Sequence, residues 1–323
     1  MRNQLPSPFI LSGLFLLCLV VSSKPSLAEI VQADSKTTPT WSDVRYGKYA
    51  RNILDVYLPA DLESTDRDRK NAVPVFIFLH GGGWMAGDKK AVNVQGLLRQ
   101  GFAVVSANYR FTVGSPNAAP YPAPMLDAAR VVQYVRHRAA DWNLDAKRIA
   151  LAGSSAGAVM AMWVGYQDDL SKPDSEDPVA RQSTRVACVL PSDTPTTFDR
   201  DWILKHVGGP KKIHLATYPL FRIQNLDELA IEPKLSQVIE ATPITHLTPD
   251  DPPTYLSYQL PMTETPLPET VDSNISIHHP RFGAYLCEEL EERGVPCFMA
   301  YKGHPAKISK AEFLKRYLLG AGT

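Results

Sequence analysis

The seven apolar residues Val73–Leu79 (VPVFIFL) are followed directly by the sequence HGGGW at His80–Trp84. A continuous apolar run of this length, rich in β-forming residues, is typical of a strand buried on both faces of a parallel sheet. Three consecutive glycines at its carboxyl end let backbone N–H groups turn toward a ligand without obstruction by side chains. The chain is therefore expected to present a ligand-binding loop at the edge of a buried parallel sheet.

Segments with strand character alternate with segments of helical periodicity along the rest of the chain. This order predicts a mostly parallel central sheet with helices on both faces. The segment Phe198–Ile244 fits the alternation poorly, and residues 29–43 resemble a loose polar lead-in. The expected strands are 52–58, 73–79, 102–108, 148–152, 186–190, 255–260 and 297–301. One expected helix begins at Met125, and the others span 158–164, 280–294 and 309–319.

The length of 323 residues, of which 44% are hydrophobic, supports one large domain with a full core. We expect this domain over residues 29–323, with a candidate cap insertion over 198–245. The net charge is zero and there is no basic block, so the composition gives no support for nucleic-acid binding.

The N-terminus has the pattern of an export signal. Arg2 precedes the apolar run Phe9–Val21, and Ser26-Leu27-Ala28 offers small residues at a cleavage site. The run is short for a membrane span. We therefore expect residues 1–28 to be removed, no stable membrane span afterwards, and a secreted or periplasmic protein; an uncleaved anchor is the alternative.

Three cysteines remain after this signal. Cys287 and Cys297 could pair in an exported protein, but an odd count does not imply a disulfide framework. Because Cys188 and Cys287 lie in apolar runs, the sequence favours buried free thiols.

The sequence Gly153-Ser154-Ser155-Ala156-Gly157 matches G-x-S-x-G between an expected strand and an expected helix. A sharp strand-to-helix turn would place Ser155, the central serine, in strained backbone with its hydroxyl projecting from the sheet. The N–H groups of Gly82, Gly83 and Ala156 would then form an oxyanion hole. His80 is expected to hold the glycine loop rather than to act as a base.

Together these residues carry a family resemblance. LHGGGW, the NYR at 108–110, the helix from Met125, AGSSAG and the preceding YGKYARNILDVYLP resemble the bacterial carboxylesterase branch of the α/β-hydrolases. The nearest likeness is to acetyl- and feruloyl-esterase-like proteins related to polysaccharide deacetylases, and to hormone-sensitive-lipase-like esterases. The resemblance implies the α/β-hydrolase fold, a Ser, His and Asp or Glu triad, no metal or other cofactor, and short acyl esters as substrates.

A serine hydroxyl needs a base within hydrogen-bond reach, and the base needs an orienting carboxylate. His304 follows the last expected strand in KGHP, where the resemblance puts the histidine, so it is our prediction for the base. His278 and His279 precede a predicted helix, and could cap that helix or line the cleft; either could be the base if His304 points away.

The acid has no clear motif, because the turn that the family has after the strand at 255–260 is missing. Asp272 is nearest to the following helix and is our prediction, so that the predicted catalytic residues are Ser155, His304 and Asp272. Glu264 and Glu269 are rivals, and Asp193 is a separate candidate because an acid after the preceding strand can also reach the histidine.

The sequence thus predicts an exported serine carboxylesterase acting on small-molecule or polysaccharide-borne esters, with the polysaccharide implied by resemblance alone. Trp84 and residues of 198–245 would shape its acyl pocket. Two alternatives stay open: a non-catalytic binding protein with a degraded triad, and a peptidase or formamidase on the same fold. No paired His/Cys spacing or phosphate-binding loop suggests a metal or nucleotide site.

Overall fold

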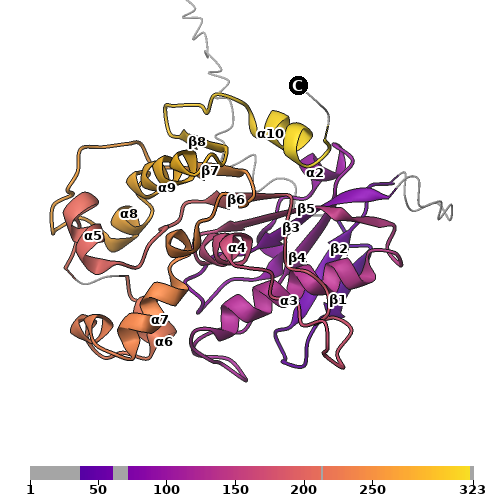
Figure 1. Cartoon of the computed structure of the whole chain (residues 1–323), viewed down its shortest axis with the longest axis horizontal. Helices are drawn as coiled ribbons and strands as arrows, with labels where there is room; N and C mark the ends of the chain where they lie inside the picture. Colours follow the sequence, from indigo (N-terminus) through magenta and orange to yellow (C-terminus); the bar gives the residue numbers. More distant parts are fainter. Residues whose placement is uncertain (1–36, 61–71, 212–213, 321–323) are drawn as a thin grey trace, which may run out of the picture. The chain divides into compact units, whose positions relative to one another are not determined.

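In the computed structural model, the described residues (37–60, 72–211 and 214–320) form one eight-stranded sheet in the order β1-β2-β4-β3-β5-β6-β7-β8 (Figure 1). β1 and β2 pair antiparallel, as do β2 and β4, and every other pair is parallel. The strands are β1 (Trp41–Arg45), β2 (Ile53–Tyr57), β3 (Val73–Leu79), β4 (Ala103–Ala107), β5 (Leu144–Ser154), β6 (Cys188–Ser192), β7 (Thr254–Tyr258) and β8 (Cys297–Tyr301).

Helices follow most of the parallel strands. The α-helices are α2 (Gln95–Leu98), α3 (Ala123–Arg138), α4 (Ala156–Tyr166), α5 (Arg200–His206), α6 (Thr217–Phe221), α7 (Lys234–Ala241), α8 (Ser273–Ile277), α9 (Arg281–Glu292) and α10 (Lys310–Tyr317). Three short 3-10 helices join them: η3 (Lys89–Ala91), η4 (Leu226–Ala230) and η5 (Pro243–His246).

Alternation along the buried strands decides which helices each side chain meets. Val75, Ile77 and Leu79 of β3 belong to the larger core, which they share with α3, α4 and α9. Phe76, between them, points the other way into a second core with Phe313 of α10. Because successive residues of a strand face opposite sides, this apolar run requires helices on both faces, and Figure 1 shows α4 and α10 on opposite sides of the sheet.

The fold is that of an α/β-hydrolase, as the sequence predicts. All seven expected strands are present, with ends that differ by a few residues, and the run 73–79 coincides with β3. The lead-in is a partial error, because Trp41–Arg45 of the polar stretch forms the edge strand β1. Its mostly exposed side chains lack the apolar alternation that would identify a strand, and the strand is formed by backbone pairing with β2.

The segment between β6 and β7 is built from short elements, namely α5, α6, η4, α7 and η5. It packs onto the sheet layer through buried side chains such as Phe198, Phe221 and Leu229, which belong to the larger core. It covers the interval over which the sequence predicts a cap insertion.

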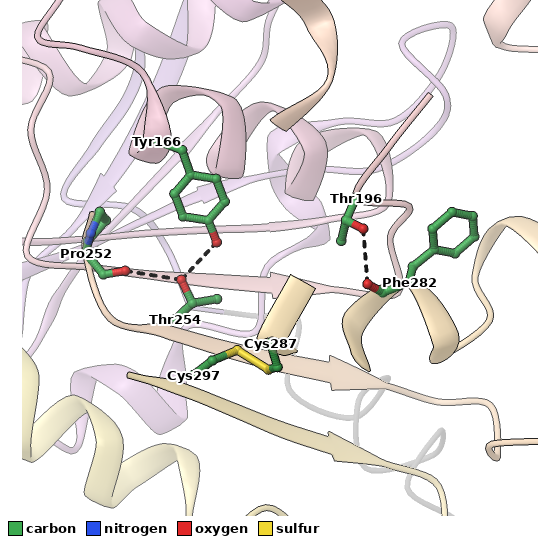
Figure 2. The surroundings of a disulfide bond; sticks show 7 residues. All are labelled: Tyr166, Thr196, Pro252, Thr254, Phe282, Cys287 and Cys297. Carbon is green, nitrogen blue, oxygen red and sulfur yellow. Dashed lines mark hydrogen bonds between the residues drawn. A yellow bond between two sulfur atoms is a disulfide. The ribbon is translucent and has the colours of Figure 1, made fainter. Parts of the chain in front are cut away.

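A disulfide joins Cys287 of α9 to Cys297 of β8 (Figure 2). The preference for a free thiol is therefore wrong for Cys287, which forms the alternative pair with Cys297, whereas Cys188 is a buried free thiol as expected. The antiparallel return from α9 to β8 brings the two Cα atoms within 5.3 Å, which the apolar character of the run around Cys287 does not reveal.

Across the described ranges, no helix is both long and apolar enough to cross a membrane. The predicted signal segment, residues 1–28, lies outside those ranges.

Candidate active site

Ser155 lies at the sharp turn between β5 and α4. Its backbone has φ +49° and ψ −118°, a conformation that residues with a side chain rarely adopt. The turn is held by a hydrogen bond from the Ser155 N–H to the carbonyl of Ser192, at the end of the neighbouring strand β6 (2.9 Å). Such strained backbone at the end of a strand is a feature of functional sites, and the strand–turn–helix context predicted for the G-x-S-x-G sequence is present.

The two glycines of this turn are required by close backbone contacts. A Cβ atom on Gly157 would overlap the carbonyl oxygen of Leu79, and one on Gly153 would overlap the backbone of Gly157. The start of α4 therefore lies directly against the end of β3. This contact brings the turn carrying Ser155 beside the glycine loop that follows β3.

The glycine loop approaches Ser155 closely. A Cβ atom placed on Gly81 would stand 3.4 Å from the Cβ of Ser155. Gly82 and Gly83 have φ +106° and +58°, values that favour glycine. Within the described part of the chain, the N–H groups of Gly82, Gly83 and Ala156 donate no hydrogen bond, so they are free to bind an anionic oxygen.

His80 fixes the base of this loop. Its Nδ1 donates to the Gly81 carbonyl (2.7 Å), and its ring stacks on Tyr109 with centroids 4.4 Å apart. The Tyr109 hydroxyl donates to the carbonyl of His80 (2.8 Å). Burial lowers the pKa of His80, so the ring is neutral near pH 7. These contacts agree with a supporting role.

His278 is the histidine that meets Ser155. The Ser155 hydroxyl lies 2.9 Å from His278 Nε2 and donates to it when that nitrogen is unprotonated. His278 follows the short helix α8 and occupies its C-cap position. His278 is one of the candidates from the sequence, but its place beside His279 at the end of a short helix gives no signal of which histidine points toward the serine.

The surroundings of His278 favour its neutral form. Burial is the largest cause and lowers its pKa below the usual range. The negative charge of Asp193 and the Asn274 backbone oppose this shift, and His214 adds to it. A neutral imidazole with Nε2 toward a hydroxyl is the state that a general base needs.

Asp193 is the carboxylate whose charge acts on His278. It follows β6, with φ +45°, and its N–H donates to the Ser257 carbonyl (2.9 Å). Its Oδ1 accepts a hydrogen bond from the N–H of Gln259 (2.7 Å). Both bonds tie Asp193 to β7 and to Gln259 directly after it. Asp193 and Ser155 therefore both lie at the carboxyl ends of neighbouring parallel strands.

The structure does not bring His304 to Ser155. His304 sits in a tight turn in which its backbone pairs with Tyr301 of the edge strand β8, and its exposed ring packs on that tyrosine (centroids 4.7 Å apart). Adjacent strands are about 4.8 Å apart, so β8 lies roughly 14 Å from β5 across the sheet. The turn is too short to carry the ring back over that distance, and the prediction of His304 is wrong.

Asp272 is likewise displaced from the predicted role. Its side chain caps α8 by accepting from the Asn274 N–H (2.7 Å), and it is exposed. Of the rivals, Glu269 pairs with Lys211 at the surface and Glu264 is exposed. His279 is buried and structural: Thr263 and the N–H of Arg281 occupy its two ring nitrogens.

A small cavity of about 30 Å³ opens beside Ser155. Gly83 and Ala156 line it, so two of the three predicted oxyanion donors share a space with the serine. Trp84 and residues of the 198–245 segment form most of the rest. The full lining is Gly83, Trp84, Ser155, Ala156, Val159, Pro195, Phe198, His214, Ala216, Thr217 and Ile277. The described residues contain no cluster of three or more metal-ligating side chains.

Comparison with known proteins gives this geometry a context. The family model described as BD-FAE matches residues 54–258. A probable carboxylic ester hydrolase, LipM, of Mycobacterium tuberculosis is 26% identical over 66% of this chain and 46% of its own length. The chain spans about half or less of the curated relatives that it matches most strongly.

Solved structures share the fold. One, a truncated form of a carbohydrate esterase from gut microbiota, superposes with a TM-score of 0.61 at 20% identity, over 83% of this chain and 88% of the other. Another, an acetyl ester-xyloside bifunctional hydrolase from Caldicellulosiruptor lactoaceticus, gives 0.60 at 20% identity, over 88% and 92%.

Proposed function

The chain belongs to the BD-FAE family, and on that premise we propose that it is a carboxylic ester hydrolase that works through an acyl-enzyme on Ser155. The observation that carries the proposal is the 2.9 Å contact between the Ser155 hydroxyl and Nε2 of His278. The names of its relatives support ester hydrolysis as the reaction. The strained turn, the glycine loop and the neutral histidine supply the parts that such a reaction needs.

The reaction proceeds in two halves. His278 takes the hydroxyl proton as Ser155 Oγ attacks the ester carbonyl, and the N–H groups of Gly82, Gly83 and Ala156 stabilise the oxyanion. The intermediate collapses when the His278 imidazolium protonates the leaving alcohol, which leaves the acyl group on Ser155. Water then attacks the acyl-enzyme, His278 takes its proton, and the carboxylic acid leaves as Ser155 is reprotonated.

Asp193 is the proposed triad acid, in place of Asp272. Its charge raises the pKa of His278 against the effect of burial, which stabilises the imidazolium that forms during each half-reaction. It comes between Ser155 and His278 in the chain, the order Ser, acid, His expected on this fold. Its backbone and side-chain bonds to β7 and Gln259 hold it in place.

The size of the cavity supports a short acyl group. A cavity needs about 10–15 Å³ of such volume to hold one water molecule. The cavity of about 30 Å³ therefore has room for about two water-sized groups, which matches an acetyl or similar chain. The alcohol is a further proposal: a carbohydrate-borne ester agrees with the names of the solved structures and with export. Export itself is supported by the N-terminal pattern and by the Cys287–Cys297 disulfide, a bond typical of oxidising compartments.

The alternatives predict different behaviour. A binding protein with a degraded triad has no use for a histidine held 2.9 Å from the serine, so this contact favours the enzyme. A peptidase or formamidase would use the same site on amides. A panel of matched esters and anilides separates these two activities.

The test is hydrolysis of p-nitrophenyl acetate by the mature protein, by Ser155→Ala and by Ser154→Ala as the matched control. We expect the first variant to lose kcat by up to about 10⁶-fold, the scale on which a triad acts as a unit, and the second to retain activity. Acetate release from acetylated xylan, assayed alongside, tests the carbohydrate substrate. Equal activity of wild type and Ser155→Ala on every ester would overturn the proposal.

A further inference from the structure

A second, larger cavity lies next to the Ser155 cavity. It measures about 430 Å³ and is formed by the segment between β6 and β7 together with Tyr285 of α9. Its apolar lining includes Leu226, Leu229 and Val238, which are buried, and Ile239, which is half-exposed. The charged residues Asp199, Arg200 and Asp201 also line it. On the same measure it has more than ten times the volume of the cavity at Ser155.

Among the described residues, Phe198 alone is common to the linings of the two cavities. Its ring is 5% exposed and packs between Trp84 on the Ser155 side (centroids 6.2 Å apart) and Phe221 (5.5 Å). Because Phe198 lines both cavities, it forms part of the wall between the serine's small cavity and the larger one.

The backbone on either side of Phe198 is fixed. The Phe198 N–H donates to the Thr242 hydroxyl (3.2 Å), and the hydroxyl of Thr196 donates to the carbonyl of Phe282 in α9 (3.1 Å; Figure 2). Asp199, next in the chain, caps α5. With the chain anchored at these points, shortening the side chain would remove the wall without releasing the loop.

The acyl group is the part of the substrate that this wall faces. The oxyanion donors Gly83 and Ala156 line the small cavity, whereas His278, which must reach the leaving alcohol, does not. The carbonyl carbon on Ser155 Oγ thus has its acyl substituent directed toward Trp84 and Phe198, and the alcohol on the side of His278.

We propose that Phe198 sets the acyl-chain length of this hydrolase by closing the Ser155 cavity off from the 430 Å³ cavity, whose lining is largely apolar. The inference rests on the proposed function, since it assigns the specificity of that same site. With the wall in place, chains longer than a few carbons do not fit. With the wall removed, the larger cavity accepts a medium-length alkyl chain.

The experiment measures kcat/KM on p-nitrophenyl acetate, butyrate, hexanoate and octanoate for wild type, Phe198→Ala and Phe198→Leu. Wild type should prefer the shortest chains. In Phe198→Ala the octanoate-to-butyrate ratio should rise by up to about 200-fold, because burial of each of the four extra methylenes changes kcat/KM by roughly fourfold. Phe198→Leu, which keeps most of the buried bulk and guards against a misfolded alanine variant, should show a smaller rise of the same sign.

Two further variants show whether the larger cavity is the cause. Phe221→Ala removes an equally buried aromatic ring that supports Phe198 but lines neither cavity, so its chain-length profile should shift much less than that of Phe198→Ala. Adding Val238→Phe to Phe198→Ala narrows the cavity and should reverse most of the gain.

The outcomes separate this inference from the proposed function. If wild type hydrolyses no ester, the proposed function fails. If wild type is active and folded Phe198→Ala and Phe198→Leu keep the wild-type profile, or if Phe221→Ala changes it equally, the role of Phe198 is overturned.

Discussion

The half of the site between β3 and α4 is built from two tight turns, whereas in the half between β6 and α9 the histidine lies far along a long connection from the preceding strand. In the first half, the glycine loop and the Ser155 turn each begin directly at the end of a strand, and the two strands are neighbours. In the second half, His278 comes twenty residues after the end of β7.

The two halves of the site are held by different kinds of contact, and so should respond differently to substitutions. Backbone contacts leave no room for a side chain at Gly153 or Gly157, so the first half is fixed by sterics. The second half is held by a few hydrogen bonds, such as those of Asp193 with Ser257 and Gln259. Substitutions of these two glycines should therefore affect folding, whereas substitutions of Asp193 and His278 should affect the chemistry.

The largest expected effect is the loss of the base. His278→Asn should lower kcat on p-nitrophenyl acetate by about 10⁴–10⁶-fold, because Ser155 loses its proton acceptor. His304→Asn is the matched control, and as an exposed substitution it should change activity by no more than about twofold. The reverse ranking of the two variants would restore His304 as the base.

The acid should give the next largest effect. Asp193→Asn keeps an oxygen that can accept from Gln259 but removes the charge, so we expect kcat to fall by about 10³–10⁴-fold. Asp272→Asn keeps the cap of α8, since asparagine caps helices as well as aspartate does, and should leave kcat nearly unchanged. Steady-state kinetics at saturating ester would show whether this order holds.

A substitution that disrupts the backbone contact between β3 and α4 should lower the free energy of unfolding. Gly157→Ala places a Cβ atom against the carbonyl of Leu79 in the middle of the sheet, and we expect unfolding to become easier by about 4 kcal/mol or more. The control is Gly96→Ala, in a helix with open space around it, which should stabilise by about 0.4–1 kcal/mol. Urea unfolding measures both; a mild effect of Gly157→Ala would mean that β3 and α4 can separate at little cost.

The smallest expected effect concerns the pH dependence of kcat/KM, which reports on His278 in the second half of the site. Burial lowers the pKa of His278, so the base stays unprotonated at a lower pH than an ordinary histidine does. The acid limb of the kcat/KM profile should therefore have its midpoint below pH 6.5. Below that midpoint, activity should fall by about tenfold per pH unit.

Asp193 and His214 are the charged groups that act on this ring, in opposite directions. Removing the negative charge in Asp193→Asn should move the midpoint to still lower pH, because the imidazolium loses its partner. An unchanged midpoint would argue that Asp193 does not face His278.

The sequence by itself determined the sheet, the Ser155 turn and the glycine loop. Apolar runs such as Val73–Leu79 indicate strands buried on both faces, because they are short and rich in β-forming residues. Gly153 and Gly157 flank Ser155 at a fixed spacing, so the turn can be read from the local sequence, although the contact of Gly157 with Leu79 joins segments far apart in the chain.

Only the tertiary structure decided which histidine and which carboxylate meet Ser155. The chain has eight histidines, and the loop that carries His278 has no periodicity to fix where its side chains point. His304 occupies the expected place in sequence, yet a four-residue turn keeps it at the far edge of the sheet. Contacts between distant loops depend on where every intervening strand lies, and the local sequence does not carry that information.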